Sequence, residues 1–246
     1  MQKYKCTISY DGTNFSGFQI QPEKRTIQGE IEEAFQTIHK GEHVRIYSSG
    51  RTDTGVHAMG QTFHFKSSLM IPCQNWKQAL NALLPDDIHV QNVITVDDSF
   101  HARFSAVEKE YRYYILNRKD VDIFKRNYVY QYPYALNLSY IREACFHLQG
   151  THDFTTFSSA KATVKGSRIR TLSKVWCHRH RDILEFIFKG NGFLYHMVRI
   201  MVGALIDVGR GKIHPADIPY LIKAKDRRLL GQTAPPQGLY LWRVIY

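Results

Sequence analysis

The chain has 246 residues, 43% of them hydrophobic, which suffices for one large domain or two small ones and argues against wholesale disorder. Its net charge of +11 indicates a polyanionic partner such as nucleic acid, although a basic surface used only for solubility is the alternative. The four cysteines form no C-x-x-C pair and no stretch of about 18 apolar residues occurs, so a zinc motif and a membrane span are disfavoured and a reducing cytoplasm is expected.

The first half of the sequence alternates strand and helix patterns. Alternation of apolar and polar residues predicts strands over residues 3–10, 43–48, 60–66 and 87–96. Apolar residues at three- and four-residue spacing predict helices over 26–40, with Thr26 as N-cap, and over 75–84. This order predicts an α+β layer with the helices on one face of a sheet.

The second half loosely repeats the pattern. Strands are expected over residues 110–116, 168–180, 182–188 and 239–245, and helices over 138–148, 193–208 and 215–224. We therefore expect two similar α+β halves, residues 1–104 and 105–246, that share an extended, mostly antiparallel sheet.

The polar loop at residues 48–58 is the strongest candidate for an active site. It places Asp53 two residues after Arg51 and between Gly50 and Gly55. A carboxylate in such a loop can be a nucleophile, a general base or a metal ligand, whereas a turn aspartate that bonds its own backbone has no chemical role. Arg51 could keep the carboxylate ionised through a charge-assisted hydrogen bond.

Metal and phosphate-loop chemistry find little support. His57 follows Asp53 by four residues, and His64 and His101 come later, but no H-E-x-x-H or paired-carboxylate spacing occurs. The G-x-x-x-x-G-K-[ST] and G-x-S-x-G motifs are missing as well. The sequence therefore predicts no metal site.

Residues 161–181 form the clearest basic stretch, because they contain several cations and no acid. On a strand pair, alternate side chains would form one cationic face able to follow a phosphate backbone, and a solvated face is the alternative. We expect three of these cations to contact RNA: Lys165, Arg168 and Arg170.

Two other residues stand out from their surroundings. Arg199 lies within the apolar helix predicted over 193–208, where a charge is costly unless an acid pairs with it, and Asp53, Asp207 or another acid could serve. Tyr111, in an aromatic strand, could stack on a base or pack in the core.

The motif Gly50-Arg51-Thr52-Asp53-x-Gly55-Val56-His57-Ala58 resembles the A type of tRNA pseudouridine synthases. The resemblance extends nearly from end to end of the chain, in ordered blocks at the spacing of that family. The further blocks include Tyr10-Asp11-Gly12, Gly17-Phe18-Gln19-x-Gln21, Arg25-Thr26-Ile27-Gln28, Gly60-Gln61, residues 100–106, Tyr111-Arg112-Tyr113, residues 193–203, Ala224-Lys225-Asp226-Arg227 and Gly238-Leu239-Tyr240.

This resemblance implies an isomerase without a cofactor, which detaches uracil from C1′ of a uridine in RNA, rotates it and rejoins it through C5. Asp53 matches the essential aspartate, which acts either on the base or at the ribose. Arg51 and Arg199 match basic residues near that aspartate. Tyr111 matches a tyrosine that stacks on the target base and assists proton removal, and Leu239 matches an apolar residue of the uracil pocket.

The resemblance also implies the fold and the partners. The pseudouridine-synthase fold would carry an active-site cleft between its halves, and the substrate would be the anticodon arm of tRNA at positions 38–40, bound by a cytoplasmic homodimer. Four residues in or beside the matched blocks are expected to contact substrate: Gln19, Arg25, Thr54 and His57.

Two residues depart from the family pattern. Thr54 replaces the alanine that usually follows the aspartate, and Phe18 stands where tryptophan is common. A divergent paralogue with a narrowed choice of uridines, or a tRNA-binding protein without catalysis, is therefore the alternative hypothesis. A metal-dependent nuclease is a third, and the lack of a carboxylate cluster disfavours it.

Overall fold

The computed structural model describes residues 1–159 and 166–246. The chain divides into two units, one made of Met1–Val107 and Tyr240–Tyr246, the other of Glu108–Leu239. The chain passes from the first unit to the second after Val107, close to the boundary after residue 104 that the sequence predicts. The last seven residues, expected in the second half, belong instead to the first unit.

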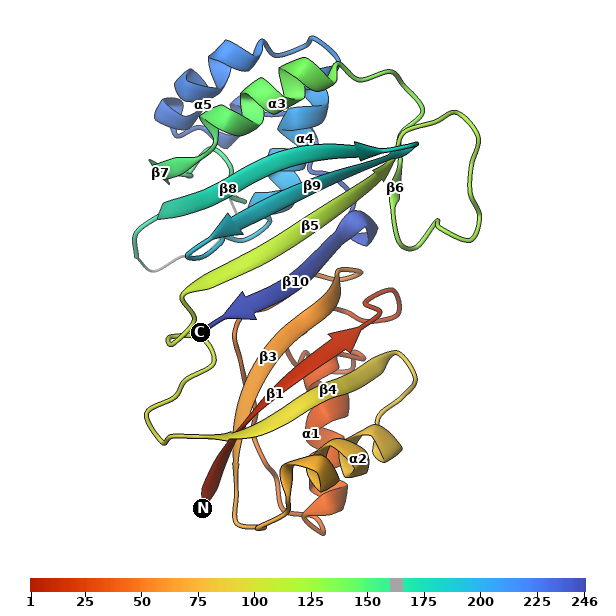
Figure 1. The fold of residues 1–246 in the computed structure, drawn as a ribbon, viewed down its shortest axis with the longest axis vertical. Helices are drawn as coiled ribbons and strands as arrows, with labels where there is room; N and C mark the ends of the chain where they lie inside the picture. The colour runs from red at the N-terminus through yellow and green to blue at the C-terminus, as the bar shows by residue number, and fades with distance from the viewer. Residues whose placement is uncertain (160–165) are drawn as a thin grey trace. The chain divides into compact units, whose positions relative to one another are not determined.

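The first unit contains a sheet whose strands run in the order β4-β1-β3-β10 (Figure 1). Strand β2 pairs with β3 as well. All these pairs are antiparallel except β3 with β10, which is parallel. The elements are β1 (Gln2–Tyr10), α1 (Ile27–Ile38), β2 (Tyr47–Ser48), β3 (His57–Ser67), α2 (Cys73–Leu83), β4 (Ile88–Val96) and β10 (Leu239–Ile245).

Aromatic side chains fix both helices of this unit on the same face of the sheet. Tyr4 of β1 and Phe65 of β3 are register partners, and their rings stack at 5.1 Å. Phe35 of α1 lies 4.4 Å from the Phe65 ring, and Trp76 of α2 lies 5.7 Å from the Tyr4 ring. The expected packing of helices on one face is therefore confirmed in this unit.

The second unit contains strands in the order β5-β9-β8-β7, all antiparallel, with β6 parallel to β5 (Figure 1). Helix α3 packs against β8 and α4. The elements are β5 (Glu108–Leu116), β6 (Tyr130–Gln131), α3 (Leu138–His147), β7 (Gly150–Asp153), β8 (Ile169–His180), β9 (Ile183–Gly190), α4 (Met197–Gly209) and α5 (Ile218–Ala224). The α+β class predicted from the sequence is confirmed.

Three predicted elements differ from the structure. The strand expected over 43–48 is reduced to β2, because the backbone N–H of Ile46 donates to Oε1 of Glu32 in α1 (3.0 Å) rather than to a strand. The helix expected over 193–208 begins only at Met197, since His196 before it has a left-handed backbone (φ 62°). Within β8, the register shifts between Leu172 and Lys174.

The shift in β8 changes the predicted cationic face. Leu172 and Val175 are both fully buried, although they are three residues apart, so they share one face across the shift. Arg170, two residues before Leu172, takes the buried side, and Lys174, next to Val175, takes the other. The single cationic face expected along this strand is therefore wrong.

Candidate functional site

The loop after β2 carries Asp53 and is anchored at its start to β3. The N–H of Ser49 donates to the carbonyl of Thr62 (2.7 Å), and its hydroxyl donates to Oε1 of Gln61 (2.6 Å). The amide nitrogen of the buried Gln61 donates in turn to the carbonyl of Gly50 (2.9 Å). These bonds fix the backbone from which Arg51 and Asp53 project.

A buried hydroxyl pair holds the residue next to Asp53. The hydroxyls of Tyr10 and Thr52 lie 2.8 Å apart, and burial raises the pKa of Tyr10 far above its usual value. The phenol therefore stays protonated and keeps its hydrogen bond at every physiological pH. Asp53 itself is half-buried, and its carbonyl accepts from the N–H of Val56 (3.1 Å), which closes the turn.

The loop over residues 11–25 packs directly on the Asp53 loop. The N–H of Phe18 donates to the carbonyl of Thr52 (3.1 Å). Gly17 has φ +94°, and a Cβ there would lie 2.9 Å from the same carbonyl. A Cβ on Gly12 would lie 2.0 Å from the carbonyl of Val56. Only glycine at these two positions lets the loops approach so closely.

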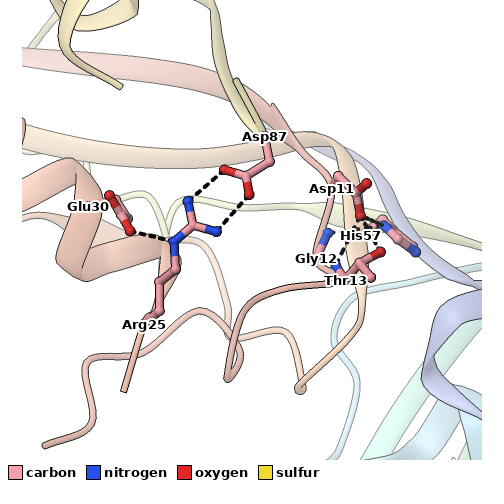
Figure 2. Close-up of polar contacts among 7 residues, drawn as sticks. All are labelled: Asp11, Gly12, Thr13, Arg25, Glu30, His57 and Asp87. Carbon is pink, nitrogen blue, oxygen red and sulfur yellow. Dashed lines mark hydrogen bonds and ion pairs between the residues drawn. The ribbon is translucent and has the colours of Figure 1, made fainter. Parts of the chain in front are cut away.

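Arg25 connects this loop to two acids (Figure 2). Its terminal nitrogens form a bidentate pair with Asp87 at 2.7 and 3.0 Å, and its Nε donates to Glu30 at 2.7 Å. The guanidinium also lies 4.1 Å from the centre of the Phe15 ring. Two carboxylates thus balance its charge, so in this structure Arg25 supports the loop, and its expected contact with substrate stays a prediction.

His57, at the start of β3, is buried and also supports the loops (Figure 2). Its Nδ1 lies 3.0 Å from the N–H of Gly12 and 3.1 Å from Oδ1 of Asp11. These contacts belong to different protonation states: an unprotonated Nδ1 accepts from Gly12, and a protonated one pairs with Asp11. The ring also stacks on Tyr240 of β10 at 4.7 Å.

The remaining expected substrate contacts of the first unit are at the surface. Gln19, Arg51 and Thr54 are all exposed. Exposed polar side chains on well-anchored loops suit contact with a macromolecule, and their role in substrate binding stays a prediction.

In the second unit, Tyr111 and Arg199 are each held by neighbours. Tyr111 on β5 is mostly buried, and its ring meets that of Phe193 edge to face at 4.9 Å. Arg199 on α4 is half-buried, and its Nε donates to the carbonyl of Ala234 (2.8 Å). Asp207, one of the acids considered as its partner, pairs with Lys212 at 3.4 Å.

Leu239 follows a segment that packs on β5. It is buried, and a Cβ on the preceding Gly238 would lie 2.7 Å from the Tyr113 ring. The Tyr113 hydroxyl donates to the carbonyl of Pro235 (2.7 Å). The segment over residues 230–238 therefore sets both the start of β10 and the carbonyl that binds Arg199.

The predicted RNA contacts in the basic stretch have local partners. Arg168 donates to the hydroxyl of Ser158 (3.0 Å), and Arg170 donates to the carbonyls of Ser167 (3.0 Å) and Ile169 (2.6 Å). Lys165 lies outside the described residues.

Within residues 1–159 and 166–246, no group of three or more histidine, cysteine or acidic side chains is placed to hold a metal ion. In the same part of the chain, no helix is long and apolar enough to cross a membrane.

Sequence reasoning missed the supports of the Asp53 loop. Tyr10, Thr52 and Gln61 hold this loop in place, yet none was expected to contribute to the site. The signal was available, because all three lie in motifs that resemble the family blocks.

Comparison with known proteins defines the class of this protein. A model of the tRNA pseudouridine synthase family matches residues 7–105 and 144–246. The chain belongs to this family.

Similar proteins described as tRNA pseudouridine synthase A occur in several bacteria. One from Oceanobacillus iheyensis is 58% identical over 246 residues, which covers 100% of this chain and 97% of that protein. Relatives from a Geobacillus species and from Bacillus subtilis are 54% and 52% identical over 245 residues. They cover 100% and 99% of this chain, and 98% and 99% of their own lengths.

Proposed function

We propose that this protein converts uridine to pseudouridine in the anticodon arm of tRNA, at positions 38, 39 or 40. The observation that carries the proposal is the Asp53 loop, in which a half-buried carboxylate sits on a backbone held by Tyr10, Gln61 and Gly17. Membership of the tRNA pseudouridine synthase family supports the reaction and the substrate.

The reaction is an isomerisation, so its atoms balance without a co-reactant. The bond from C1′ to N1 of uracil breaks, a bond from C1′ to C5 forms, and the C5 proton leaves while N1 gains a proton. Asp53 starts the reaction at the base or at the ribose. A catalytic carboxylate must be held in position when substrate binds, which the loop contacts described above achieve.

The other roles follow the family resemblance. Arg51 and Arg199 offset the negative charge of Asp53 and of the RNA backbone. Tyr111 stacks on the target base, and Leu239 lines the uracil pocket. Gln19, Arg25, Thr54 and the basic residues Arg168 and Arg170 bind the RNA, and the buried His57 acts through the loops that it supports. The cleft expected between the two halves, the homodimer, the cytoplasmic location and the lack of a cofactor belong to the same proposal.

The proposal is tested by mapping pseudouridine in an unmodified tRNA transcript after incubation with the protein. Chemical tagging of pseudouridine followed by primer extension should give stops at positions 38, 39 or 40 that disappear when those uridines are replaced by cytidine. Pseudouridine confined to another arm would contradict the proposed substrate. Tight tRNA binding without any pseudouridine would favour the alternative of a binding protein without catalysis.

A further inference from the structure

The first unit carries a second feature suited to RNA, which we call the ring patch. It is a connected set of aromatic and imidazole rings with cations placed over them. The rings are Tyr47, His64, Phe100, His101, Phe104 and Tyr246, and the cations are Lys5, Arg45 and Arg103.

The rings form a continuous chain of contacts. His64 stacks on Tyr47 at 5.1 Å and meets His101 at 4.7 Å. His101 lies 4.4 Å from Phe104. On the other side, Phe100 lies 6.1 Å from His64 and 5.0 Å from Tyr246. The result is one connected cluster of rings, in which His64 is buried at the centre and Tyr47 and Phe104 are exposed.

The cations of the patch lie against rings instead of acids. Lys5 is 5.0 Å from the Tyr246 ring, Arg45 is 5.5 Å from Tyr47, and Arg103 is 5.6 Å from Phe104. Among the described residues, none of these three cations forms an ion pair with an acid. Their positive charge is therefore available to an anionic partner.

The patch is well ordered yet reaches solvent. The N–H of Ala102 donates to Nδ1 of His64 (3.1 Å), and its carbonyl accepts from the Tyr246 hydroxyl (2.8 Å). Phe104 is nevertheless 76% exposed and Tyr47 is 44% exposed. Clustered aromatic side chains that are exposed on a fixed backbone are typical of an interaction surface.

The patch is distinct from the Asp53 loop. Lys5 and His64 are register partners on β1 and β3. Their neighbours Tyr4, Cys6 and Phe65 are buried on the face that packs against α1 and α2, so Lys5 and His64 point to the opposite face of the sheet. Tyr10, which supports the Asp53 loop, lies an even number of residues along β1 from Tyr4 and Cys6 and is buried as they are.

A cavity of about 370 Å³ borders the patch at Tyr47 and His64, and Lys3, Arg45, Lys66 and Glu42 also line it. Lys66 pairs with Asp98 (2.7 Å) and Lys3 donates to the carbonyl of Phe100 (2.9 Å), so Arg45 is the cation of this cavity that can meet a phosphate. A phosphate group would fit within such a space, next to rings on which a base or ribose could stack.

We propose that the ring patch binds RNA, with exposed bases stacked on Phe104 and Tyr47 and phosphates near Arg45, Arg103 and Lys5. Alternation of uncompensated cations with exposed rings is the chemistry that single-stranded and loop RNA requires. The inference rests on the proposed function in one respect: it takes the bound RNA to be the tRNA substrate. The patch would contact a part of that tRNA that is remote from the target uridine.

Binding of fluorescently labelled, unmodified tRNA across a series of salt concentrations tests this proposal. Phe104→Ala should weaken the affinity at least about fivefold, as expected for loss of one base stack. Arg45→Gln combined with Arg103→Gln should weaken it about tenfold or more and reduce the slope of log affinity against log salt by about one to two.

Matched controls are available outside the patch. Phe146 on α3 is 71% exposed, and the Arg228 side chain is 90% exposed. Phe146→Ala and Arg228→Gln should bind tRNA as the parent protein does. Thermal melting of every variant checks that the fold is kept. Because Phe104 is exposed, its replacement by alanine should not unfold the protein, so weaker tRNA binding would report the lost contact with RNA.

Parent-like affinity and salt slope in all the patch variants would overturn the inference, even if the protein makes pseudouridine. Loss of self-association in the patch variants, with tRNA binding per folded protomer unchanged, would also overturn it by assigning the patch to a protein partner. Conversely, weaker binding by the patch variants would support the inference even if the parent protein made no pseudouridine and the proposed function failed.

Discussion

Asp53 lies in a loop whose neighbouring side chains are committed to structure. Thr52 is bonded to Tyr10, Ser49 to Gln61, and His57 to the turn at Gly12. Within the Gly50–Gly55 motif, Arg51 and Thr54 are exposed and Asp53 is half-buried, whereas Thr52 is buried. Different residues of one short loop therefore face the solvent and support the backbone.

His64 gives this unit a pH-dependent stability. Burial, together with His101 and Lys3, lowers the pKa of His64 to about 4, from an ordinary value near 6.5. Between these values the unfolded chain binds a proton that the folded protein does not, so stability is complete above about pH 6.5 and is lost as the pH falls toward 4. The contribution is on the order of 2 kcal/mol.

Urea unfolding at pH 7.0 and pH 4.5 measures this effect. The parent should lose more of its free energy of unfolding between the two pH values than His64→Asn, which keeps a side-chain acceptor for Ala102 but does not titrate. Equal losses in the two proteins would show that His64 does not cause the acid sensitivity.

At the scale of elements, the sequence predicted those helix and strand boundaries that depend on contacts between residues close together in the chain. Helix α1 begins after Thr26, whose hydroxyl accepts from the N–H of Gly29, as the capping pattern predicts. The late start of the second predicted strand depends on Glu32, whose carboxylate binds the N–H of Ile46 fourteen residues away. The late start of α4 depends on the left-handed backbone of His196, which interrupts the helix although the apolar periodicity continues through residues 193–208.

The segment over residues 230–238 is organised by Arg227. The guanidinium donates to the carbonyls of Leu230 (2.8 Å) and Gly231 (2.9 Å), and burial lowers the pKa of Arg227. The same segment supplies the carbonyl that binds Arg199 and leads into Leu239. Arg227 thus positions two residues of the proposed site without needing to touch the RNA.

We expect Arg227→Met to lower the free energy of unfolding by about 2 kcal/mol, because it leaves carbonyls without their donor. The rate of pseudouridine formation should also fall by at least about tenfold, since the segment that holds Arg199 loosens. Arg228→Met is the control, because Arg228 is exposed and pairs with Asp226, and it should unfold at the same urea concentration as the parent. Equal stability and activity in the two variants would refute this role of Arg227.

At the scale of the whole molecule, the chain returns to its first unit at the end. Tyr240 and Leu241 pair with His57 and Ala58 at the start of β3, and the carbonyl of Ile245 accepts from the N–H of Val107 (2.8 Å). Pattern analysis found the strand but assigned it to the second half, because periodicity reveals a strand and not its distant partner. The loop–loop contacts around Asp53 escaped prediction for the same reason.

Removal of residues 240–246 should therefore destabilise the first unit in particular. The deletion removes the β10 partners of His57 and Ala58 at the start of β3, together with the Tyr240 ring that stacks on His57. The melting temperature should fall by more than about 5 °C, and amide exchange at His57 and Ala58 should accelerate. Unchanged exchange at these two amides would show that β10 contributes little to the unit.

The most direct test of the central claim measures tritium released from tRNA that carries C5-tritiated uridine. The parent protein should release tritium in step with pseudouridine formation, and Asp53→Asn should release none above background. Asp86→Asn, at an exposed aspartate of the same unit, is the matched control and should release tritium as the parent does. Release by Asp53→Asn at the rate of the control would contradict the assignment of Asp53 as the catalytic carboxylate.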